Sequence, residues 1–274
     1  MTADKCALII PSSIHVSARY TTLLDPGRRE EQYLEALSWF IRESPLTKII
    51  VCDNSGYQYP KSFYQLAETH HKKIELLSFA GNNALVQEYG KGYGEGEIME
   101  FVMTHSKLIR EVEGFFKVTG RLKVVNIATV LRQSKATENY FMPVSLLRPR
   151  FLVPRAARPC VEVRVYYVTK EFFSTVLLNA YKEVRDDHTF FLEHAYYQAI
   201  ARASVAVHIP AALVTEVNPY LRIKAGDALR VRCFPTAPEI TGMSGSNGWV
   251  FKERSWSKKL LIKLVSYLGY IRPV

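Results

Sequence analysis

The sequence predicts an α/β protein in which a mostly parallel sheet is flanked by helices within a single domain. Up to residue 120, short apolar runs alternate with segments of helical periodicity, a pattern typical of right-handed βαβ units. The chain has 274 residues, 48% of them hydrophobic, so it can bury one large core. Neither an internal repeat nor a low-complexity tract interrupts the pattern.

The first half supplies the most regular elements. Each expected strand is a short apolar run that ends at polar residues, glycine or proline, and each expected helix repeats apolar residues about every 3.6 positions. In chain order, the expected elements are the strand 6–11, the helix 29–44, the strand 48–52, the helix 61–71, the strand 73–79, a helix after the glycines of 90–96, and the strand 115–120.

The second half is less regular. A helix is expected at 186–202, with Asp187 or Thr189 near its cap. The other expected elements are a helix or a strand–helix pair at 121–136, a strand exposed on one face at 161–168, a strand pairing with it at 172–178, and short strands at 213–223 and 228–233. Because no linker divides the halves, residues 1–250 are expected to form one domain, with halves 1–125 and 126–250.

Composition limits the cellular compartment and the binding partners that we expect for this protein. The four cysteines show no metal-binding spacing and are expected to be free thiols in a reducing compartment. The N-terminus lacks the features of a signal peptide, and no apolar run is long enough to span a membrane, so we expect a cytoplasmic protein. The net charge of +10 calls for an anionic partner or surface. No nucleic-acid-binding module is recognisable, so nucleic acid is not the expected partner.

Small, amide and basic residues follow all four expected strands. Ligands of open parallel sheets bind beyond the carboxyl ends of the strands, so these residues are the candidate binding site for a nucleotide-type ligand. They are Pro11, Ser12, Ser13 and Arg19 after the first strand, Asp53, Asn54 and Ser55 after the second, Asn82, Asn83, Lys91, Gly92, Gly94 and Glu95 after the third, and Thr119, Gly120 and Arg121 after the fourth. For Asp53 alone, an Asx turn within Asp-Asn-Ser-Gly is an alternative role.

The segment Gly90-Lys-Gly-Tyr-Gly-Glu-Gly96 concentrates backbone freedom directly before a helix. A glycine-rich loop that opens a helix can bind phosphate through unpaired N–H groups and the helix dipole. Its spacing matches neither the dinucleotide fingerprint nor a P-loop. This segment alone does not decide between a mobile surface loop and a phosphate-binding loop.

The order CALIIP, KIIVCDNSG, GKGYGEGEI and FFKVTGRLKVVN resembles small bacterial glycosyltransferases of the GT-A fold, which have a Rossmann-type sheet and assemble lipopolysaccharide O-antigens and capsules. The resemblance covers most of residues 5–200. It implies a nucleotide-sugar donor whose nucleoside faces Arg19 and Asp53, while the glycine segment and Lys91 approach the diphosphate or the sugar. UDP-linked donors are slightly favoured. The acceptor is expected to be a lipid-linked saccharide.

One departure from that resemblance concerns metal binding. GT-A enzymes commonly hold a divalent cation with an Asp-x-Asp motif after the fourth strand, and this chain has none. Lys117 and Arg121 stand there instead, where they would repel a cation but could neutralise a leaving diphosphate. The alternative is that both are solvated surface charges. We therefore expect transfer without a metal and without any other cofactor.

Transfer to a hydroxyl with inversion needs a base near the acceptor. The resemblance places that carboxylate near the start of a late helix, where this chain has Glu193 and His194, with Asp187 just upstream. We expect Glu193 to be the base, with Asp187 as second candidate, and its apolar neighbours to raise its pKa. A solvated glutamate and a capping aspartate are the alternatives, and a retaining mechanism would not need this base.

Two other classes of function are open. An S-adenosylmethionine-dependent methyltransferase would usually have its glycine-rich loop after the first strand, where this chain has PSSIHV. A non-catalytic protein that binds nucleotides or nucleic acid would also suit the charge. The second glycine-rich stretch, 241–248, is either a lid that closes on the donor or a passive linker.

The C-terminal segment 251–274 is expected to form a basic amphipathic helix. The charged residues that follow Glu253 are all basic, and they are interspersed with apolar residues. Aromatic residues flank the segment. Such helices lie in the plane of anionic membranes, which predicts peripheral attachment to the inner face of the cytoplasmic membrane. Packing on the core and a contact between two copies in a homo-oligomer are the alternatives.

Overall fold

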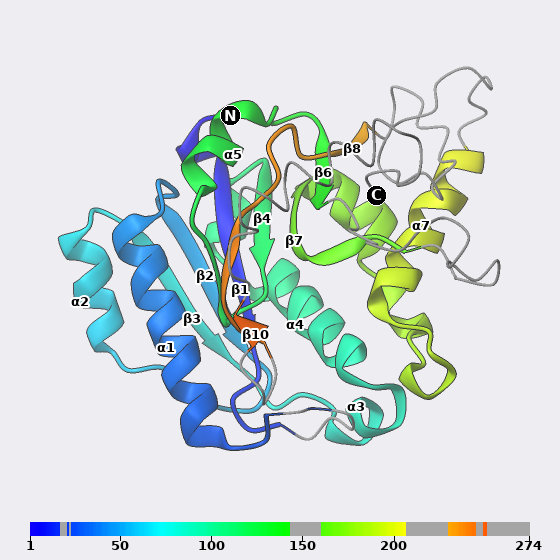
Figure 1. Ribbon diagram of the computed structural model, residues 1–274, viewed down its shortest axis with the longest axis horizontal. Coiled ribbons are helices and arrows are strands. Elements are labelled where there is room, and N and C mark those ends of the chain that lie inside the picture. The colour runs from blue at the N-terminus through cyan, green and yellow to red at the C-terminus, as the bar shows by residue number, and fades with distance from the viewer. Residues whose placement is uncertain (17–20, 22, 143–159, 207–229, 245–248, 251–274) are drawn as a thin grey trace.

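The computed structural model describes residues 1–16, 21, 23–142, 160–206, 230–244 and 249–250 (Figure 1). A seven-stranded sheet runs through it, and three short strands form a second sheet. The large sheet contains β1 (Cys6–Ser12), β2 (Lys48–Asp53), β3 (Lys73–Ser78), β4 (Gly114–Val118), β6 (Asn139–Met142), β7 (Glu162–Thr169) and β8 (Val231–Cys233), and the small sheet contains β5 (Leu122–Val124), β9 (Ile240–Ser244) and β10 (Trp249–Val250).

The strand order of the large sheet is β3-β2-β1-β4-β7-β6-β8. The first four neighbours are parallel, β7 is antiparallel to both β4 and β6, and β8 is parallel to β6. The expected α/β class, a mostly parallel sheet flanked by helices in a single domain, is confirmed. Because β1 to β4 are parallel, their carboxyl ends meet at one edge of the sheet.

Helices cover both faces of the sheet (Figure 1). The longer ones are α1 (Pro26–Glu43), α2 (Ser62–Thr69), α3 (Asn83–Tyr89), α4 (Lys91–His105), α5 (Ile127–Gln133) and α7 (Leu192–Ala206). Alternate residues of a strand point to opposite faces. Leu8 and Ile10 of β1 thus share a core with α1, α2 and α5, whereas Ala7 and Ile9 share another with α4 and α7.

The start of α1 illustrates how local sequence sets an element boundary. The side chain of Asp25 accepts a hydrogen bond from the N–H of Arg28 at 2.7 Å, and Pro26 occupies the first helical position. Tyr33, Leu37 and Phe40 then place a buried stripe against the sheet. No helix in the described part of the chain is long and apolar enough to cross a membrane.

The glycine-rich segment is a helix, which corrects the expected loop. Helix α4 begins at Lys91, so Gly92, Gly94 and Gly96 lie inside it. Only Gly90 precedes the helix, with φ = +107°. The additional helix α3 comes directly before it, started by the Asn82 side chain, which accepts from the N–H of Leu85.

Three further expectations change in the second half. Residues Phe173–Leu177 form a π-helical segment instead of a strand, because Thr169 caps the preceding turn and Phe173 and Leu177 pack into the core. Helix α7 begins at Leu192, and the turn Asp186–His188 stands apart from it. Strand β7 is buried on both faces from Val165 to Val168 instead of being exposed on one face. The strand–helix alternative for 121–136 is confirmed by β5 and α5.

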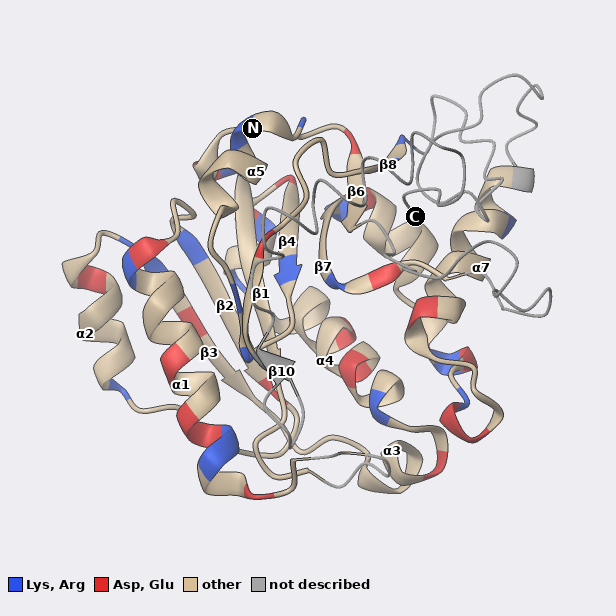
Figure 2. Cartoon of the chain, viewed as in Figure 1, with Lys and Arg blue, Asp and Glu red and all other residues tan. Residues whose placement is uncertain are grey.

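Several expectations fall outside the described residues. They concern Arg19, the strand at 213–223, residues 245–248 of the second glycine-rich stretch, and the C-terminal segment 251–274. Within the described part, acidic and basic residues are interspersed along α1, α4 and the loop that leads to α7 (Figure 2).

Candidate functional site

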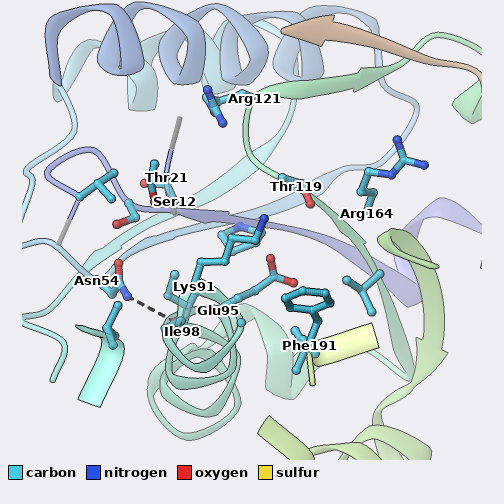
Figure 3. A pocket seen from close by; sticks show the side chains of 18 of the residues that line it. Ser12, Thr21, Asn54, Lys91, Glu95, Ile98, Thr119, Arg121, Arg164 and Phe191 are labelled. Carbon is cyan, nitrogen blue, oxygen red and sulfur yellow. Dashed lines mark hydrogen bonds between the residues drawn. The ribbon is translucent and has the colours of Figure 1, made fainter. Parts of the chain in front are cut away.

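A cavity of about 380 Å³ opens at the carboxyl ends of β1, β2 and β4 (Figure 3). Helix α4, the start of β7 and the start of α7 complete its walls. We call it the strand-end cavity. Twelve of the residues expected from the sequence line it, namely Pro11, Ser12, Ser13, Asn54, Asn83, Lys91, Gly92, Gly94, Glu95, Thr119, Arg121 and Glu193. A neighbouring recess of about 400 Å³ shares His15, Val16, Asn54 and Asn83 with it.

Seven other expected residues do not line the strand-end cavity, and Arg19 is not described. One of them, Asn82, caps the start of α3. Four of them adjoin the floor of the cavity: Asp53, Lys117 and Gly120 contact residues that line it, and Ser55 lines the neighbouring recess. The remaining two, Asp187 and His194, lie on the turn before α7 and in its first turn. The side chain of Asp187 is about half exposed and lies 3.4 Å from His188. The Nδ1 atom of His194 accepts a hydrogen bond from the N–H of Phe191 at 3.0 Å, so it caps the start of α7.

Asp53 holds the floor of the cavity together instead of facing it. Its carboxylate is fully buried and accepts hydrogen bonds from the hydroxyl of Ser12, the N–H of Ile14 at 3.0 Å, and both the N–H and the hydroxyl of Ser55 at 2.7 and 2.5 Å. These donors belong to the loops after β1 and β2. Asp53 therefore joins these two loops through its buried carboxylate, instead of facing a nucleoside as the sequence suggested.

The glycines of α4 allow close approach of neighbouring elements. A Cβ atom on Gly96 would lie 2.0 Å from the ring of Tyr181, and a Cβ atom on Gly90 would lie 2.0 Å from the carboxylate of Asp186. Gly90 also has a positive φ, which disfavours any other residue there. Gly94 accepts, through its carbonyl oxygen, a hydrogen bond from the Asn54 amide at 3.3 Å, which fixes Asn54 beside the cavity.

Asp186 occupies the N-terminus of α4, where the glycine-rich sequence suggested bound phosphate. Its Oδ2 atom accepts from the N–H of Lys91 at 3.1 Å, and burial raises the pKa of its carboxyl. A carboxylate at this position interacts favourably with the helix dipole. The protein thus supplies its own anion there. The turn that presents Asp186 is closed by two hydrogen bonds between the backbones of Arg185 and Phe190.

An ion pair forms part of the cavity floor. The Nζ atom of Lys117 lies 2.5 Å from Oε1 of Glu95, and it also donates to the carbonyl of Val163 at 2.8 Å and to the hydroxyl of Thr119 at 3.1 Å. The Lys117 side chain is fully buried. Its donors are taken by protein acceptors, so Lys117 does not reach a diphosphate as the sequence suggested. Neither does it lie on the surface as a solvated charge.

Two cations of the cavity remain available for a ligand. Lys91 extends from α4 toward the middle of the cavity, and Arg121 approaches from the opposite wall (Figure 3). Neither forms an ion pair with any residue that the structure describes; Arg121 donates to the side chain of Gln32 at 3.1 Å. Arg29 also lines the cavity, but it is buried and donates to the carbonyls of Ser13 and Leu23. It therefore positions the loop after β1.

Glu193 supplies an acidic group on the α7 side of the cavity. Burial is the main cause that raises the pKa of its carboxyl, and the negative charges of Glu95 and Glu162 raise it further. The backbone N–H of Glu193 and the charge of Lys91 act in the opposite direction. A buried carboxylate of raised pKa that lines a cavity is a candidate proton acceptor.

Sequence reasoning missed several residues that line the cavity, and no local signal marks them. Glu162 and Arg164 on β7 form a side-chain pair, with Nε of Arg164 2.8 Å from Oε1 of Glu162. Asp186 was indistinguishable from Asp187 by residue type. The left-handed Thr189, with φ = +54°, helps close the turn that points Asp186 into the cavity.

A divalent cation would require several protein oxygen or nitrogen ligands close together. Among the residues that the structure describes, no three His, Cys, Asp or Glu side chains lie together in a way that could hold a metal ion. The carboxylate of Glu95 is instead paired with an ammonium group.

No protein-family model and no curated protein matches this chain. Solved structures with a similar fold include the glycosyltransferase GlyE of Streptococcus pneumoniae TIGR4, with 13% identity, a TM-score of 0.36, and coverage of 61% of this chain and 35% of that one. Glucosyl-3-phosphoglycerate synthase of Mycobacterium tuberculosis, in complex with Mn²⁺, UDP-glucose and phosphoglyceric acid, has 11% identity and a TM-score of 0.39, with coverage of 98% and 81%.

A cytidylyltransferase of Leptospira borgpetersenii has 8% identity and a TM-score of 0.39, with coverage of 97% and 95%. Glycosyltransferases and nucleotidyltransferases are thus both among the proteins of similar fold. The chain spans 35% of the length of the pneumococcal enzyme. All three TM-scores lie below 0.5, so these likenesses carry no conclusion about function.

Proposed function

We propose that this protein transfers a sugar from a nucleotide-sugar donor to a hydroxyl group of an acceptor. The observation that carries the proposal is that the strand-end cavity is lined both by cationic groups that the described residues leave unpaired and by a buried carboxyl group. Lys91 and Arg121 offer cationic groups without ion-pair partners among the described residues, and Glu193 offers a carboxyl group of raised pKa. A leaving nucleoside diphosphate needs the first kind of group, and a hydroxyl that loses its proton needs the second.

In the proposed reaction, the hydroxyl oxygen of the acceptor forms a bond to the anomeric carbon of the donor sugar. The bond between that carbon and the phosphate oxygen breaks, and its electron pair stays with the nucleoside diphosphate. Lys91 and Arg121 compensate the charge of this leaving group, Arg121 with the planar fork that suits phosphate oxygens. Glu193 accepts the hydroxyl proton.

The nucleoside is proposed to bind at the β1–β2 side of the strand-end cavity, next to Ser12 and Asn54. Two observations support this placement. The Asn54 amide is fixed by the Gly94 carbonyl, and its Oδ1 atom has no hydrogen-bond partner among the described residues. The neighbouring recess also continues from this side, past His15. A UDP-linked sugar is the proposed donor.

Ligand binding is the first test of the proposed function. Thermal unfolding is measured with UDP-, GDP-, CMP- and TDP-linked sugars, with S-adenosylmethionine and with single-stranded nucleic acid. We expect stabilisation by the nucleotide sugars of one base, because a ligand that binds only the folded state raises the midpoint. Stabilisation by S-adenosylmethionine or nucleic acid alone would contradict the proposal and favour the methyltransferase or the non-catalytic binding protein.

We also propose that the transfer needs no metal ion, because Lys91 and Arg121 can compensate the diphosphate charge themselves. The Lys117–Glu95 pair supports this, since a carboxylate held by an ammonium group is a poor ligand for a cation. Release of nucleoside diphosphate is measured with EDTA and after addition of Mn²⁺ or Mg²⁺. Equal rates are expected; loss of activity in EDTA that either metal restores would contradict the proposal.

The acceptor is proposed to be a lipid-linked saccharide, as in surface polysaccharide synthesis, reached at the inner face of the cytoplasmic membrane. This part rests on the sequence, in which Lys258, Lys259 and Lys263 lie beside apolar residues of the segment 251–274. Flotation with anionic and neutral liposomes tests it. We expect binding to anionic vesicles that weakens with salt and is lost without residues 255–274. Equal flotation of the truncated chain would contradict membrane attachment by this segment.

A further inference from the structure

The carboxylate of Glu95 lines the strand-end cavity and is paired with a fully buried cation. Its Oε1 atom lies 2.5 Å from the Nζ atom of Lys117, while the residue itself lines the cavity with a side chain that is 22% exposed. One oxygen therefore points into the protein toward the ammonium group. No hydrogen bond from a described residue engages the second oxygen, Oε2, so it remains available to a ligand.

The ammonium group behind Glu95 is buried and is also held by two other protein groups. Lys117 is 0% exposed, and its remaining donors reach the Val163 carbonyl and the Thr119 hydroxyl, with the ring of Tyr166 5.7 Å away. Burying an ammonium group costs free energy unless its partners are well placed. The pair thus forms a fixed dipole whose negative end faces the cavity.

We infer that Glu95 touches the transferred sugar and stabilises the positive charge that develops at its anomeric carbon. The inference rests on the proposed glycosyl transfer and adds a catalytic residue to it. Glu95 forms no covalent bond in this role. The acceptor oxygen bonds to the anomeric carbon, the phosphate oxygen leaves with the electron pair, and Glu193 takes the proton.

The positions of the surrounding charges support this role. Lys91 stands one helical turn before Glu95 on α4, so the two project from the same side of the helix, as Figure 3 shows. A sugar diphosphate bound along this side would place its phosphate near Lys91 and its sugar near Glu95. Positive charge develops on the sugar and negative charge on the phosphate as their bond breaks, and preorganised charges of opposite sign stabilise both.

The other charged residues near Glu95 are less suited to this role. Glu162 is engaged by Arg164 in a side-chain pair, with 2.8 Å between Oε1 and Nε. Asp186 is engaged by the N-terminus of α4. Glu193 has the raised pKa that suits a proton acceptor, and the charge of Glu95 contributes to that shift. Two neighbouring carboxyl groups in different environments divide the acid–base and electrostatic roles between them.

The test compares Glu95→Gln with the wild type and with Glu88→Gln, an exposed glutamate of α3 outside the cavity. Release of nucleoside diphosphate from UDP-glucose, UDP-galactose and GDP-mannose is measured, together with the binding of UDP and GDP. We expect Glu95→Gln to lower kcat by about 10²-fold or more, as the loss of a preorganised charge does, with nucleoside diphosphate affinity unchanged. Glu88→Gln should match the wild type.

Two further measurements separate a catalytic charge from a structural one. Glu95→Gln should shift the acid limb of the pH–rate profile to lower pH, because the charge that helps raise the pKa of Glu193 is gone. The double variant Glu95→Gln/Lys117→Met leaves no unpaired ammonium in the floor and provides a folded protein if the single variant unfolds. The kcat of this double variant should fall by as much as that of Glu95→Gln.

Each outcome decides one of the two proposals. If the wild type binds and cleaves none of the nucleotide sugars, the proposed function is wrong and the role of Glu95 falls with it. If the wild type is active and a folded variant without the Glu95 charge keeps kcat within about threefold, only the role of Glu95 is wrong.

Discussion

Two groups of charged residues at the strand-end cavity differ in how the protein engages them: the floor, with Asp53 and Lys117, and the rim, with Lys91, Arg121 and Glu193. On the floor, Asp53 and Lys117 are fully buried and bonded to several protein groups. At the rim, Lys91 and Arg121 face the cavity, and neither is in an ion pair with a described residue. A charged residue at the end of a strand can therefore serve the fold or the ligand, and substitutions should separate the two roles.

The largest effect on stability is expected on the floor. Lys117→Met leaves a carboxylate oxygen of Glu95 in a buried position without its cation, which should lower the free energy of unfolding by about 3–5 kcal/mol. Urea unfolding measures it. Lys5→Met is the control, because Lys5 and Glu113 form a pair at 2.7 Å in which both side chains are more than half exposed. It should cost less than about 1 kcal/mol. Equal losses would remove the distinction between floor and surface charges.

The largest effect on activity is expected at the rim, from Glu193→Gln. Loss of a positioned base should lower kcat by about 10²–10⁴-fold with little change in stability or nucleotide affinity. Asp187→Asn is the matched control, because Asp187 is about half exposed and does not line the cavity. It should keep the wild-type rate. A Glu193→Gln protein that is folded and retains turnover within about tenfold would exclude this residue as the base.

The pH dependence sharpens the same distinction. Burial raises the pKa of Glu193, and only its deprotonated form accepts a proton. The profile of kcat/KM should therefore fall on the acid side at a pH above the ordinary glutamate value of about 4.3. The same limb should be absent in Glu193→Gln. A limb at the ordinary value in the wild type would contradict a buried base.

A smaller effect is expected where α4 packs against its neighbours. The Cβ atom of Gly96→Ala would meet the buried ring of Tyr181, so the variant should lose about 1–3 kcal/mol despite the better helix propensity of alanine. Gly27→Ala in α1 is the control, because the nearest atom to its Cβ is the Asp25 carboxylate at 3.4 Å. Thermal unfolding of both proteins should show a lower midpoint for Gly96→Ala alone.

The strands of the first half could be predicted because their signal is local. Apolar, β-branched runs such as Ile49–Val51 predict buried strands wherever they pack. The helix at the glycines of α4 could not be predicted, because glycine has a low intrinsic helix propensity. The reason for glycine there is the close approach of Asp186 to Gly90 and of Tyr181 to Gly96, and both of these residues are distant in sequence. The same holds for Phe173–Leu177, whose β-branched and aromatic residues follow a helix cap at Thr169.

Some residues of the candidate site could likewise be predicted from the sequence, and others could not. Residues that follow strands, such as Asn54 and Thr119, come together because parallel strands end at one edge. The sequence could not separate Lys117 from Lys91, because burial of an ammonium group depends on carbonyl and carboxylate partners from other elements. It also could not choose Asp186 over Asp187, since a turn of only a few residues decides which carboxylate points into the cavity.

Lys91 and Arg121 are proposed to bind the diphosphate of a nucleotide sugar. Calorimetric titration of UDP and GDP into the wild type and into Lys91→Met/Arg121→Met tests it most directly, at two salt concentrations. We expect one nucleotide to bind the wild type and the double variant to bind it about tenfold more weakly or worse. A rise in salt concentration should weaken binding to the wild type more than binding to the variant. Absence of binding by the wild type, or equal affinity in the double variant, would contradict it.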